Sequence, residues 1–530
     1  MAPLRPARPI GVRHGMGSRI RLASIALCCL TVVSPLVWRL TAQLIQVKTL
    51  PIADGDQWRI FPSANSGMGD VSIALADSLL DPFVNPAKGS RMRPKSGGAF
   101  FGSPAFYSVS QNAGGGRTFP VGGILRSGST FGAIAFAYQE IDDVNSNRQF
   151  TPPPPVLRGV DGSPVTIDEP SRQNQFAFAS IGRVFAGHDL SVAGGVQWSR
   201  LHDIDGVDLL YAGSAGIDQH GNAVDARLGV TKDWVTRTGT RTAEAILLRN
   251  GFDMTHDVTW ADQVWDANTR TFTTRARVDH NLDRTDTWGL HLGYSQPAAD
   301  SGWRVGAIAT ANLMSHPKLP DYQIARVAVI PWDPGHTAAY DLGVGVSKVH
   351  GPTTLGFDAI FEPIATHTWG EAHGPTPTQS GGTIPDGGKT TENHFRFSNS
   401  IVRGGVGHDL DLGSQQTLRL QLGIALRSID YSLRQLDHVA EAERRQHEHW
   451  TEWTRTWGLG LHFSDLEIRY AGRRATGTGR PGILPSGGVI FDAPVALSAG
   501  SNILAAPTGP LTLTGVAVTT HQISVSLPIR

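Results

Sequence analysis

Apolar and polar residues alternate with a period of two along much of the chain after about residue 98. The clearest stretch is 418–426, where leucine or isoleucine occupies every second position and Arg419, Gln421, Gly423 and Ala425 lie between them. Residues 189–199 and the last strand, 522–529, repeat this pattern. Successive side chains of a β-strand point to opposite faces, so the pattern predicts strands with one apolar and one polar face.

The polar face separates two architectures that both produce alternation. A soluble sandwich exposes a face rich in Lys, Glu, Thr and Asp, whereas here the polar positions are mainly Gly, Ser, Ala and Gln with an occasional Arg. Charges are nearly missing from the apolar faces, as lipid contact requires. Aromatic residues mark strand ends, as in the girdles of membrane barrels: Trp198, Trp288, Tyr294, Trp303, Tyr340 and Trp453. The fold class we expect is all-β, a transmembrane antiparallel β-barrel.

The spacing of these segments predicts about 14 strands, an even number as closed single-chain barrels require. Short connections, such as 186–188, alternate with long polar ones at 142–172 and 370–392. Residues 207–273 do not divide clearly into strands. Glycine permits local bends in a strand, so the pairs Gly122-Gly123 and Gly404-Gly405 are candidates for an inward bend.

The N-terminal residues predict export. Five arginines between residues 5 and 21 precede the uncharged run 22–38, and the small residues Thr41 and Ala42 follow. This is the order of residues in a secretory signal peptide. Pro35 interrupts the run, which is also short for a membrane-spanning helix, and this argues against a retained membrane anchor. We therefore expect a signal peptide over residues 1–42 and a bacterial outer-membrane location. The only cysteines, Cys28 and Cys29, lie in this leader, so no disulfide is expected in the mature chain.

Charge argues against a nucleic-acid partner. Only 17% of the residues are charged, and 46 basic side chains balance 46 acidic ones to a formal net charge of +0. The chain as a whole therefore has no electrostatic attraction to a phosphate backbone.

One segment before the strands has a different pattern, SGMGDVSIALADSLLDPFVNPAKGS at residues 66–90. Residues 71–80 predict a short helix with Leu75, Leu79 and Leu80 on one side, which ends before Asn85-Pro86 because a residue preceding proline avoids the helical region. Such a short helix is marginal in water, so we expect surrounding barrel walls to hold it. The alternative is a periplasmic tail or a surface helix.

This segment resembles the N-terminal signature of FadL-type barrels, which transport hydrophobic compounds, and is similar to that of the related PorV-type barrels. The resemblance rests on Gly67-Met68-Gly69, residues 74–77 and Asn85-Pro86-Ala87. It implies a barrel of about fourteen strands with the segment as a hatch in its lumen. Asp70-Val71 and the terminal Ile529-Arg530 depart from the family pattern.

The expected domains are a signal peptide at 1–42, a periplasmic segment and hatch at 43–97, and a barrel at 98–530. The residues expected to form the hatch and gate a ligand are Met68, Leu75, Asp77, Leu79, Leu80, Phe83, Asn85 and Pro86.

Other motifs do not predict chemistry. Residues 477–482 fit G-x-G-x-x-G but lack the helix that the dinucleotide motif requires. Residues 440–449, which include His447 and His449, are better interpreted as a charged, solvent-facing loop helix than as metal ligands. His367 and His373 likewise lack a metal-binding spacing. His291, His462 and Asp341 are expected on polar faces that line a hydrated lumen. We expect no enzyme activity and assign no catalytic residue, no cofactor and no metal site.

The resemblance implies an outer-membrane channel for passive uptake of hydrophobic small molecules, such as long-chain fatty acids or aromatic hydrocarbons. Its expected partners are a hydrophobic ligand, outer-membrane lipid and, during biogenesis, the barrel-assembly machinery; the sequence does not indicate an oligomeric state. A PorV-like scaffold for protein secretion and a general porin are the alternatives. Only family analogy favours transport over the scaffold.

Overall fold

The computed structural model of the chain describes residues 57–92, 96–109, 115–142, 172–204, 216–266, 270–298, 302–316, 322–324, 327–330, 335–372, 374–413, 416–478 and 516–529. The expected signal peptide at 1–42 lies outside these residues. None of the helices within them is long and apolar enough to cross a membrane.

Sixteen antiparallel strands form one closed barrel, in which β1 pairs with β20. The all-β antiparallel barrel is therefore confirmed, while the expected number of about 14 is wrong. The strands are β1 Ser96–Val109, β2 Gly115–Ser127, β3 Thr130–Asp142, β4 Arg172–Phe185, β5 Leu190–Leu201, β6 Gly216–Thr236, β7 Gly239–Asp266, β8 Thr271–Ala298, β9 Trp303–His316, β12 Gly335–His350, β13 Thr353–Glu371, β16 Lys389–Gly413, β17 Gln416–Asp437, β18 Ala442–His462, β19 Glu467–Thr478 and β20 Val516–Ile529. Two small hairpins lie outside the barrel, β10 Tyr322–Ile324 with β11 Val327–Ile330, and β14 Thr376–Pro377 with β15 Thr383–Ile384.

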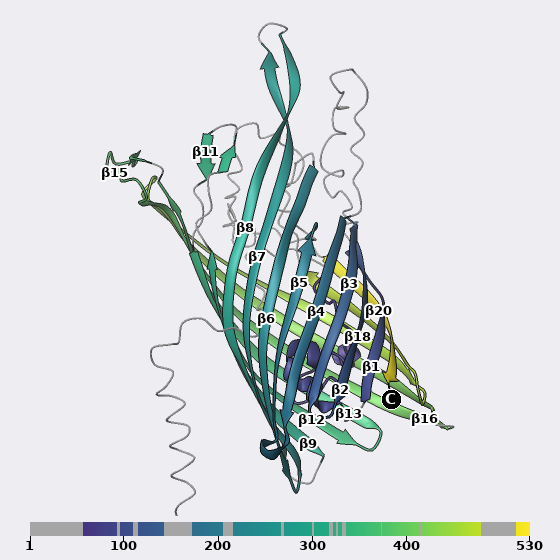
Figure 1. Cartoon of the computed structure of the whole chain (residues 1–530). Coiled ribbons are helices and arrows are strands. Elements are labelled where there is room, and N and C mark those ends of the chain that lie inside the picture. The colour runs from purple at the N-terminus through teal and green to yellow at the C-terminus, as the bar shows by residue number, and fades with distance from the viewer. Residues whose placement is uncertain are drawn as a thin grey trace, which may run out of the picture.

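Two stretches differ from the strand pattern expected from the sequence. Residues 207–273 include β6, β7 and the start of β8, and the β7–β8 hairpin projects beyond the other strands (Figure 1). Charged residues interrupt the alternation of these strands. Residues 440–449, expected as a loop helix, instead turn into β18 at Ala442. Both faces of β18 are polar there, and a strand without an apolar face gives no period-two signal.

The outer face of the barrel carries the apolar side chains. Leu420, Leu422 and Ile424 of β17 are exposed, as are Leu342 and Val344 of β12. Exposed aromatic residues flank this band. Phe185, Trp234, Tyr294 and Trp303 lie near the short turns, while Phe119, Tyr138, Trp198, Tyr340 and Trp453 lie toward the opposite end. An exposed apolar band between two aromatic girdles is typical of a barrel that spans a membrane.

The two ends of the barrel differ in their connections. Short turns join β2 to β3, β4 to β5 and β12 to β13 at one end, whereas most connections at the other end are long, and the β7–β8 hairpin projects far from it (Figure 1). In outer-membrane barrels the short turns are periplasmic and the long loops external. We call these ends the inner and outer ends of the barrel.

Residues 57–92, which we call the inner segment, lie against the inside of the wall. Its turn η1 (Ser66–Met68) contacts β16 to β19, and its turn η2 (Pro86–Arg91) contacts β2 to β6. A segment that touches the polar faces of strands in two separate arcs of a closed ring must lie within the ring, where the purple segment is seen in Figure 1.

The inner segment is mostly irregular, so the helix expected at residues 71–80 is wrong. The only α-helix described in the chain is α2, Asp81–Val84, and it carries Pro82 in its first turn. Leu79 and Leu80 donate their backbone N–H groups to the Asp77 carboxylate, each at 3.0 Å. A side chain that accepts hydrogen bonds from these backbone N–H groups competes with helix formation over residues 71–80.

The wall has one local irregularity near the inner segment. Strand β1 shifts register between Phe101 and Ala105 against β2, and between Gly102 and Ala105 against β20, with one extra residue on β1 in both cases. This is a β-bulge. The glycine pairs expected to bend the wall, Gly122-Gly123 and Gly404-Gly405, lie instead in regular ladders.

Candidate functional site: the barrel interior

Glycines on the inward faces of the strands allow the backbone of the inner segment to approach the wall. A Cβ atom on Gly405 would overlap the carbonyl of Met68, one on Gly423 would overlap the backbone of Gly69, and one on Gly229 would overlap Asn85. Close backbone approach is a general use of glycine within strands. The glycine-rich polar face seen in the sequence is therefore the surface on which the inner segment sits.

Polar side chains of the wall hold this segment at several points. Gln421 donates to the carbonyl of Ala64 at 2.9 Å, and Ser347 donates to that of Ala74 at 2.7 Å. Thr456 bridges the segment, because its hydroxyl donates to the carbonyl of Gly67 at 3.0 Å and accepts from Gly69 N–H at 2.9 Å. These contacts satisfy backbone groups that irregular structure would otherwise leave unpaired.

The carboxylate of Asp77 organises the fold of the segment itself. It accepts from the Ser63 hydroxyl at 2.6 Å and from Ala64 N–H at 2.9 Å, in addition to Leu79 and Leu80. One buried side chain thus joins two stretches of the segment. Hydrogen bonds to a charged acceptor are each worth about 1.5–3 kcal/mol, so Asp77 is a main determinant of this conformation.

Asp70, the first departure from the family pattern, adopts φ +61°, a left-handed conformation that favours glycine. Arg59 donates to both of its carboxylate oxygens, at 3.0 and 2.5 Å. Burial alone would raise the pKa of Asp70, but the Arg59 guanidinium more than offsets this and holds the pKa at about 2. The ion pair with Arg59 therefore accompanies a backbone conformation that is unusual for aspartate.

The far end of the segment is fixed to β6 and β7. Asn85 is fully buried and donates to Glu244 at 2.9 Å, while its side-chain oxygen accepts from Ala87 N–H at 3.1 Å. Lys88 forms ion pairs with Glu244 at 3.1 Å and with Asp81 at 3.4 Å. Lys88, Glu244 and Asp81 thus form a charge network inside the barrel.

Aromatic side chains complete the contact with the wall. Phe83 stacks on Phe61 within the segment with a centroid distance of 4.4 Å. It also packs edge-on against Phe100 of β1 at 5.5 Å and Phe178 of β4 at 5.1 Å. Phe83 therefore connects the inner segment to β1 next to the bulge.

The structure places the eight predicted hatch residues in two environments. Met68, Asp77, Phe83, Asn85 and Pro86 are buried, whereas Leu75, Leu79 and Leu80 are partly exposed. Leu75, Leu79 and Leu80 do not form one face of a helix, because residues 71–80 are not helical.

A cavity of about 330 Å³ lies between the inner segment and β13, β16, β17 and β19. Met68, Leu75 and Pro82 supply apolar lining, and three of the predicted residues, Met68, Leu75 and Asp77, border the cavity. Its wall residues Thr354, Arg419 and Arg469 lie close to the short turns. The cavity is thus on the inner side of the segment.

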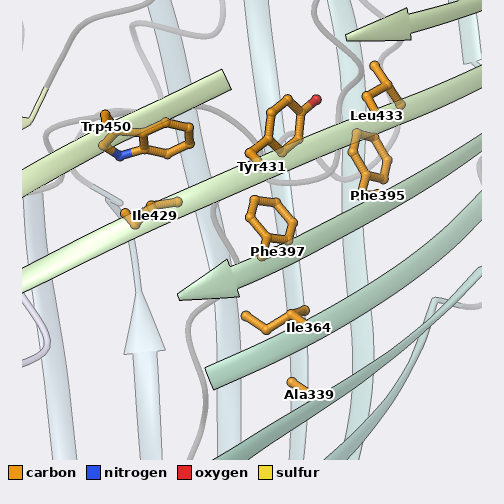
Figure 2. Close-up of a cluster of buried hydrophobic side chains, with 8 residues drawn as sticks. All are labelled: Ala339, Ile364, Phe395, Phe397, Ile429, Tyr431, Leu433 and Trp450. Atoms are coloured by element: carbon orange, nitrogen blue, oxygen red, sulfur yellow. The ribbon is translucent and has the colours of Figure 1, made fainter. Parts of the chain in front are cut away.

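The opposite, outer half of the interior carries an apolar cluster of eight side chains from β12, β13, β16, β17 and β18 (Figure 2). Its centre is Tyr431, whose ring lies 5.2 Å from Phe397 and 6.3 Å from Trp450. We call this set the upper cluster: Ala339, Ile364, Phe395, Phe397, Ile429, Tyr431, Leu433 and Trp450. No hydrogen-bond partner is found for Tyr431 Oη or Trp450 Nε1 within the described part of the chain.

Sequence reasoning missed the upper cluster although a signal was present. In β17 the apolar residues occupy even positions up to Leu426 and odd positions from Ile429 to Leu433. Because strand faces alternate strictly, this change of phase moves the apolar side chains from the outside of the barrel to its interior. His291 and Asp341 lie buried on the inward faces, as expected, but the outer half of the interior also carries the apolar upper cluster.

Comparisons with solved structures find FadL-type barrels among the matches. A Pseudomonas aeruginosa FadL homologue matches with a TM-score of 0.40 and 12% identity over 88% of this chain and 98% of that one. The Pseudomonas putida toluene transporter TodX matches with a TM-score of 0.36 and 10% identity over 92% and 99%. The FrpB iron transporter from Neisseria meningitidis matches with a TM-score of 0.31 and 11% identity over 84% and 83%. At these scores the similarity does not decide between transported substrates.

No protein-family model and no curated protein matches the chain. The functional conclusion therefore rests on the barrel interior itself.

Proposed function

We propose that this protein is an outer-membrane channel for the passive uptake of hydrophobic small molecules, such as long-chain fatty acids or aromatic hydrocarbons. The observation that carries the proposal is the upper cluster, a group of buried aromatic and aliphatic side chains on the inside of a membrane barrel. The lumen of a general porin is polar and filled with water. Apolar walls with a few polar groups are characteristic of binding sites for hydrophobic ligands.

In this proposal the inner segment is the hatch. A ligand enters from the outer end, separates the packed side chains of the upper cluster and moves past the segment toward the cavity bordered by Met68, Leu75 and Asp77. Phe83, Asn85 and Pro86 anchor the segment to the wall, while the partly exposed Leu79 and Leu80 belong to the part that shifts. Gating of this kind needs a small local rearrangement of an irregular segment, which is the usual behaviour of ligand-binding loops.

The bulge in β1 is the proposed point of sideways exit toward the membrane. Bulges disrupt a strand ladder locally, and here the disruption faces both neighbours, β2 and β20. Phe100, adjacent to the bulge, contacts Phe83 of the hatch. A shift of the segment that changes the contact between Phe83 and Phe100 would therefore act on β1 beside the bulge.

The proposed organisation keeps the sequence boundaries: a signal peptide at 1–42, a periplasmic segment and hatch at 43–97, and a barrel at 98–530, which the barrel-assembly machinery inserts into outer-membrane lipid. No specific observation favours the PorV-like scaffold or the general porin, so both become outcomes of the test.

The test is uptake of a radiolabelled long-chain fatty acid by proteoliposomes that contain the full-length protein. We expect uptake above that of empty vesicles, and a severalfold loss in Phe397→Gln, which places an amide in the upper cluster. Ser398→Gln is the matched control, because Ser398 is exposed and the change should leave uptake intact. Deletion of residues 57–92, or Leu79→Asp, should also alter uptake and binding.

Three results would contradict the proposal. Equal uptake by protein-containing and empty vesicles, together with stable co-purification of exported proteins, would indicate the scaffold. Wide ion conductance of the wild-type protein in planar bilayers would indicate the porin. Uptake and binding that do not change in any hatch variant would exclude gating by the inner segment.

A further inference from the structure

A group of histidines gathers on the outside of the barrel at its outer end. His336, His367 and His394 are register partners on the adjacent strands β12, β13 and β16. The rings of His367 and His394 stack at 4.3 Å with an interplanar angle of 8°. Paired strands hold these side chains on one face at the spacing of the sheet, so the group rests on a regular scaffold.

This group lies beyond the lipid-facing band. On β16 the outward positions above the exposed Val402 are Ser400, Ser398, Arg396 and His394. On β17 the corresponding outward positions continue as Ser428, Asp430, Ser432 and Arg434. Charged residues on the lipid-facing side of a barrel mark the region outside the hydrocarbon.

Glu392 is the common partner of the histidines. Its Oε2 lies 2.9 Å from Nε2 of His367 and 3.9 Å from Nε2 of His394, and its Oε1 lies 3.0 Å from Nε2 of His438. The donor atoms of His367, Glu392 and His394 all lie within 4.8 Å of one another. A four-coordinate Zn²⁺ with ligands at its usual bond lengths holds neighbouring donor atoms about 3.3 Å apart. The observed separations bracket this value.

The donor set also indicates which metal fits. Imidazole nitrogens suit Zn²⁺, Cu²⁺ and Ni²⁺, whereas Mg²⁺ and Ca²⁺ prefer sites made of oxygen. Two histidines and one glutamate leave a fourth position, and His438 lies against the second oxygen of Glu392.

We propose that His367, Glu392 and His394 form a Zn²⁺ site on the outer face of the barrel, with water in the fourth position. A metal bound there would join β13 and β16 outside the membrane, and His438 would hold the second oxygen of Glu392. His367 is not apparent as a ligand in the sequence, because its partners lie on a neighbouring strand and not at a helical or loop spacing. His373, considered with it, lies outside the described residues.

Lys389 would compete with a bound metal for the Glu392 carboxylate. Its ammonium lies 2.8 Å from Glu392 Oε2 and 5.0 Å from the centre of the Trp369 ring, and its side chain is 40% exposed. In the metal-free protein Lys389 neutralises Glu392, and a bound cation would have to displace it. Removing the lysine charge should therefore strengthen zinc binding, which a purely structural role of these residues would not explain.

The experiment is titration of the untagged, chelator-treated full-length protein in detergent with Zn²⁺, by calorimetry and by competition with a zinc-binding dye. We expect one tight site per chain, a loss of affinity of at least about tenfold in His367→Ala and in His394→Ala, and a gain in Lys389→Gln. His447→Ala is the control, because His447 is an exposed histidine paired with Asp430.

Asp218, His220 and Asp257 also bring three donor atoms together on β6 and β7, so each titration is repeated in a His220→Ala background. Retention of the tight site in both His367→Ala and His394→Ala would overturn the proposal, as would its loss in His220→Ala alone or the lack of any tight site in the wild-type protein. Circular dichroism and heat-modified gel mobility establish that each variant is folded.

Discussion

At the scale of single residues, two adjacent glycines show how the barrel separates its faces. Gly405 points inward, where a Cβ atom would overlap the backbone of Met68, whereas Gly404 points outward, where the nearest atom to a Cβ would be 3.8 Å away. From the sequence, both glycines were predicted to form one site at which the strand bends inward. The structure gives only Gly405 a role in holding the inner segment.

We predict that Gly405→Val displaces the inner segment while Gly404→Val does not. Overpacking at a close contact costs roughly 1–3 kcal/mol, which the irregular segment absorbs more easily than the wall. Limited proteolysis of the protein in detergent should show cleavage within residues 57–92 only in Gly405→Val. Equal protection of both variants would contradict the assigned contact.

The Asp77 carboxylate is the second determinant at this scale. In Asp77→Asn one acceptor oxygen becomes an amide and the charge is lost, which should weaken the local fold by about 1–3 kcal/mol. Hydrogen exchange should become faster at the amides of Ala64, Leu79 and Leu80 and remain unchanged in the strands. Unchanged exchange at all three amides would show that Asp77 does not organise the segment.

At the scale of elements, the sequence predicted strands wherever one apolar phase persisted, as in residues 418–426 of β17. It failed where a strand is polar on both faces, as at 442–449 of β18, and where the phase changes, as between Leu426 and Ile429. It also predicted a helix at 71–80, because local propensity does not report that Asp77 accepts the backbone N–H groups of Leu79 and Leu80. Long-range contacts decide these elements.

The bulge in β1 leads to a prediction at this scale. In a Cys28→Ser, Cys29→Ser background, cysteines at the register partners Gly102 and Ser524 should form a disulfide, since paired strand residues are close enough for one. Oxidation should slow fatty-acid uptake by proteoliposomes severalfold, and reduction should restore it. The control pair replaces Ile134 and Ala179 on the regular β3–β4 ladder. If oxidation has the same effect on both pairs, the bulge is not a special exit.

At the scale of the whole molecule, the barrel combines an outer surface adapted to lipid with an interior divided by the inner segment. The upper cluster lies toward the outer end and the cavity of about 330 Å³ toward the inner end. The sequence predicted the membrane barrel and the position of the segment in the lumen because both depend on short-range pattern or a local motif. It could not predict the upper cluster or the cavity, since these arise from the register of strands far apart in the chain.

In the proposed mechanism the inner segment must move for a hydrophobic ligand to pass. Its most direct test is fatty-acid uptake by proteoliposomes with the segment locked to the wall, using Val71→Cys and Gly356→Cys in the cysteine-free background, at a contact where a Cβ atom on Gly356 would lie 3.3 Å from the Cβ atom of Val71. The single-cysteine variants are the controls. The predicted result is uptake that falls to the level of empty vesicles on oxidation and returns on reduction. Uptake at the wild-type rate in the oxidised, fully cross-linked protein would contradict the claim.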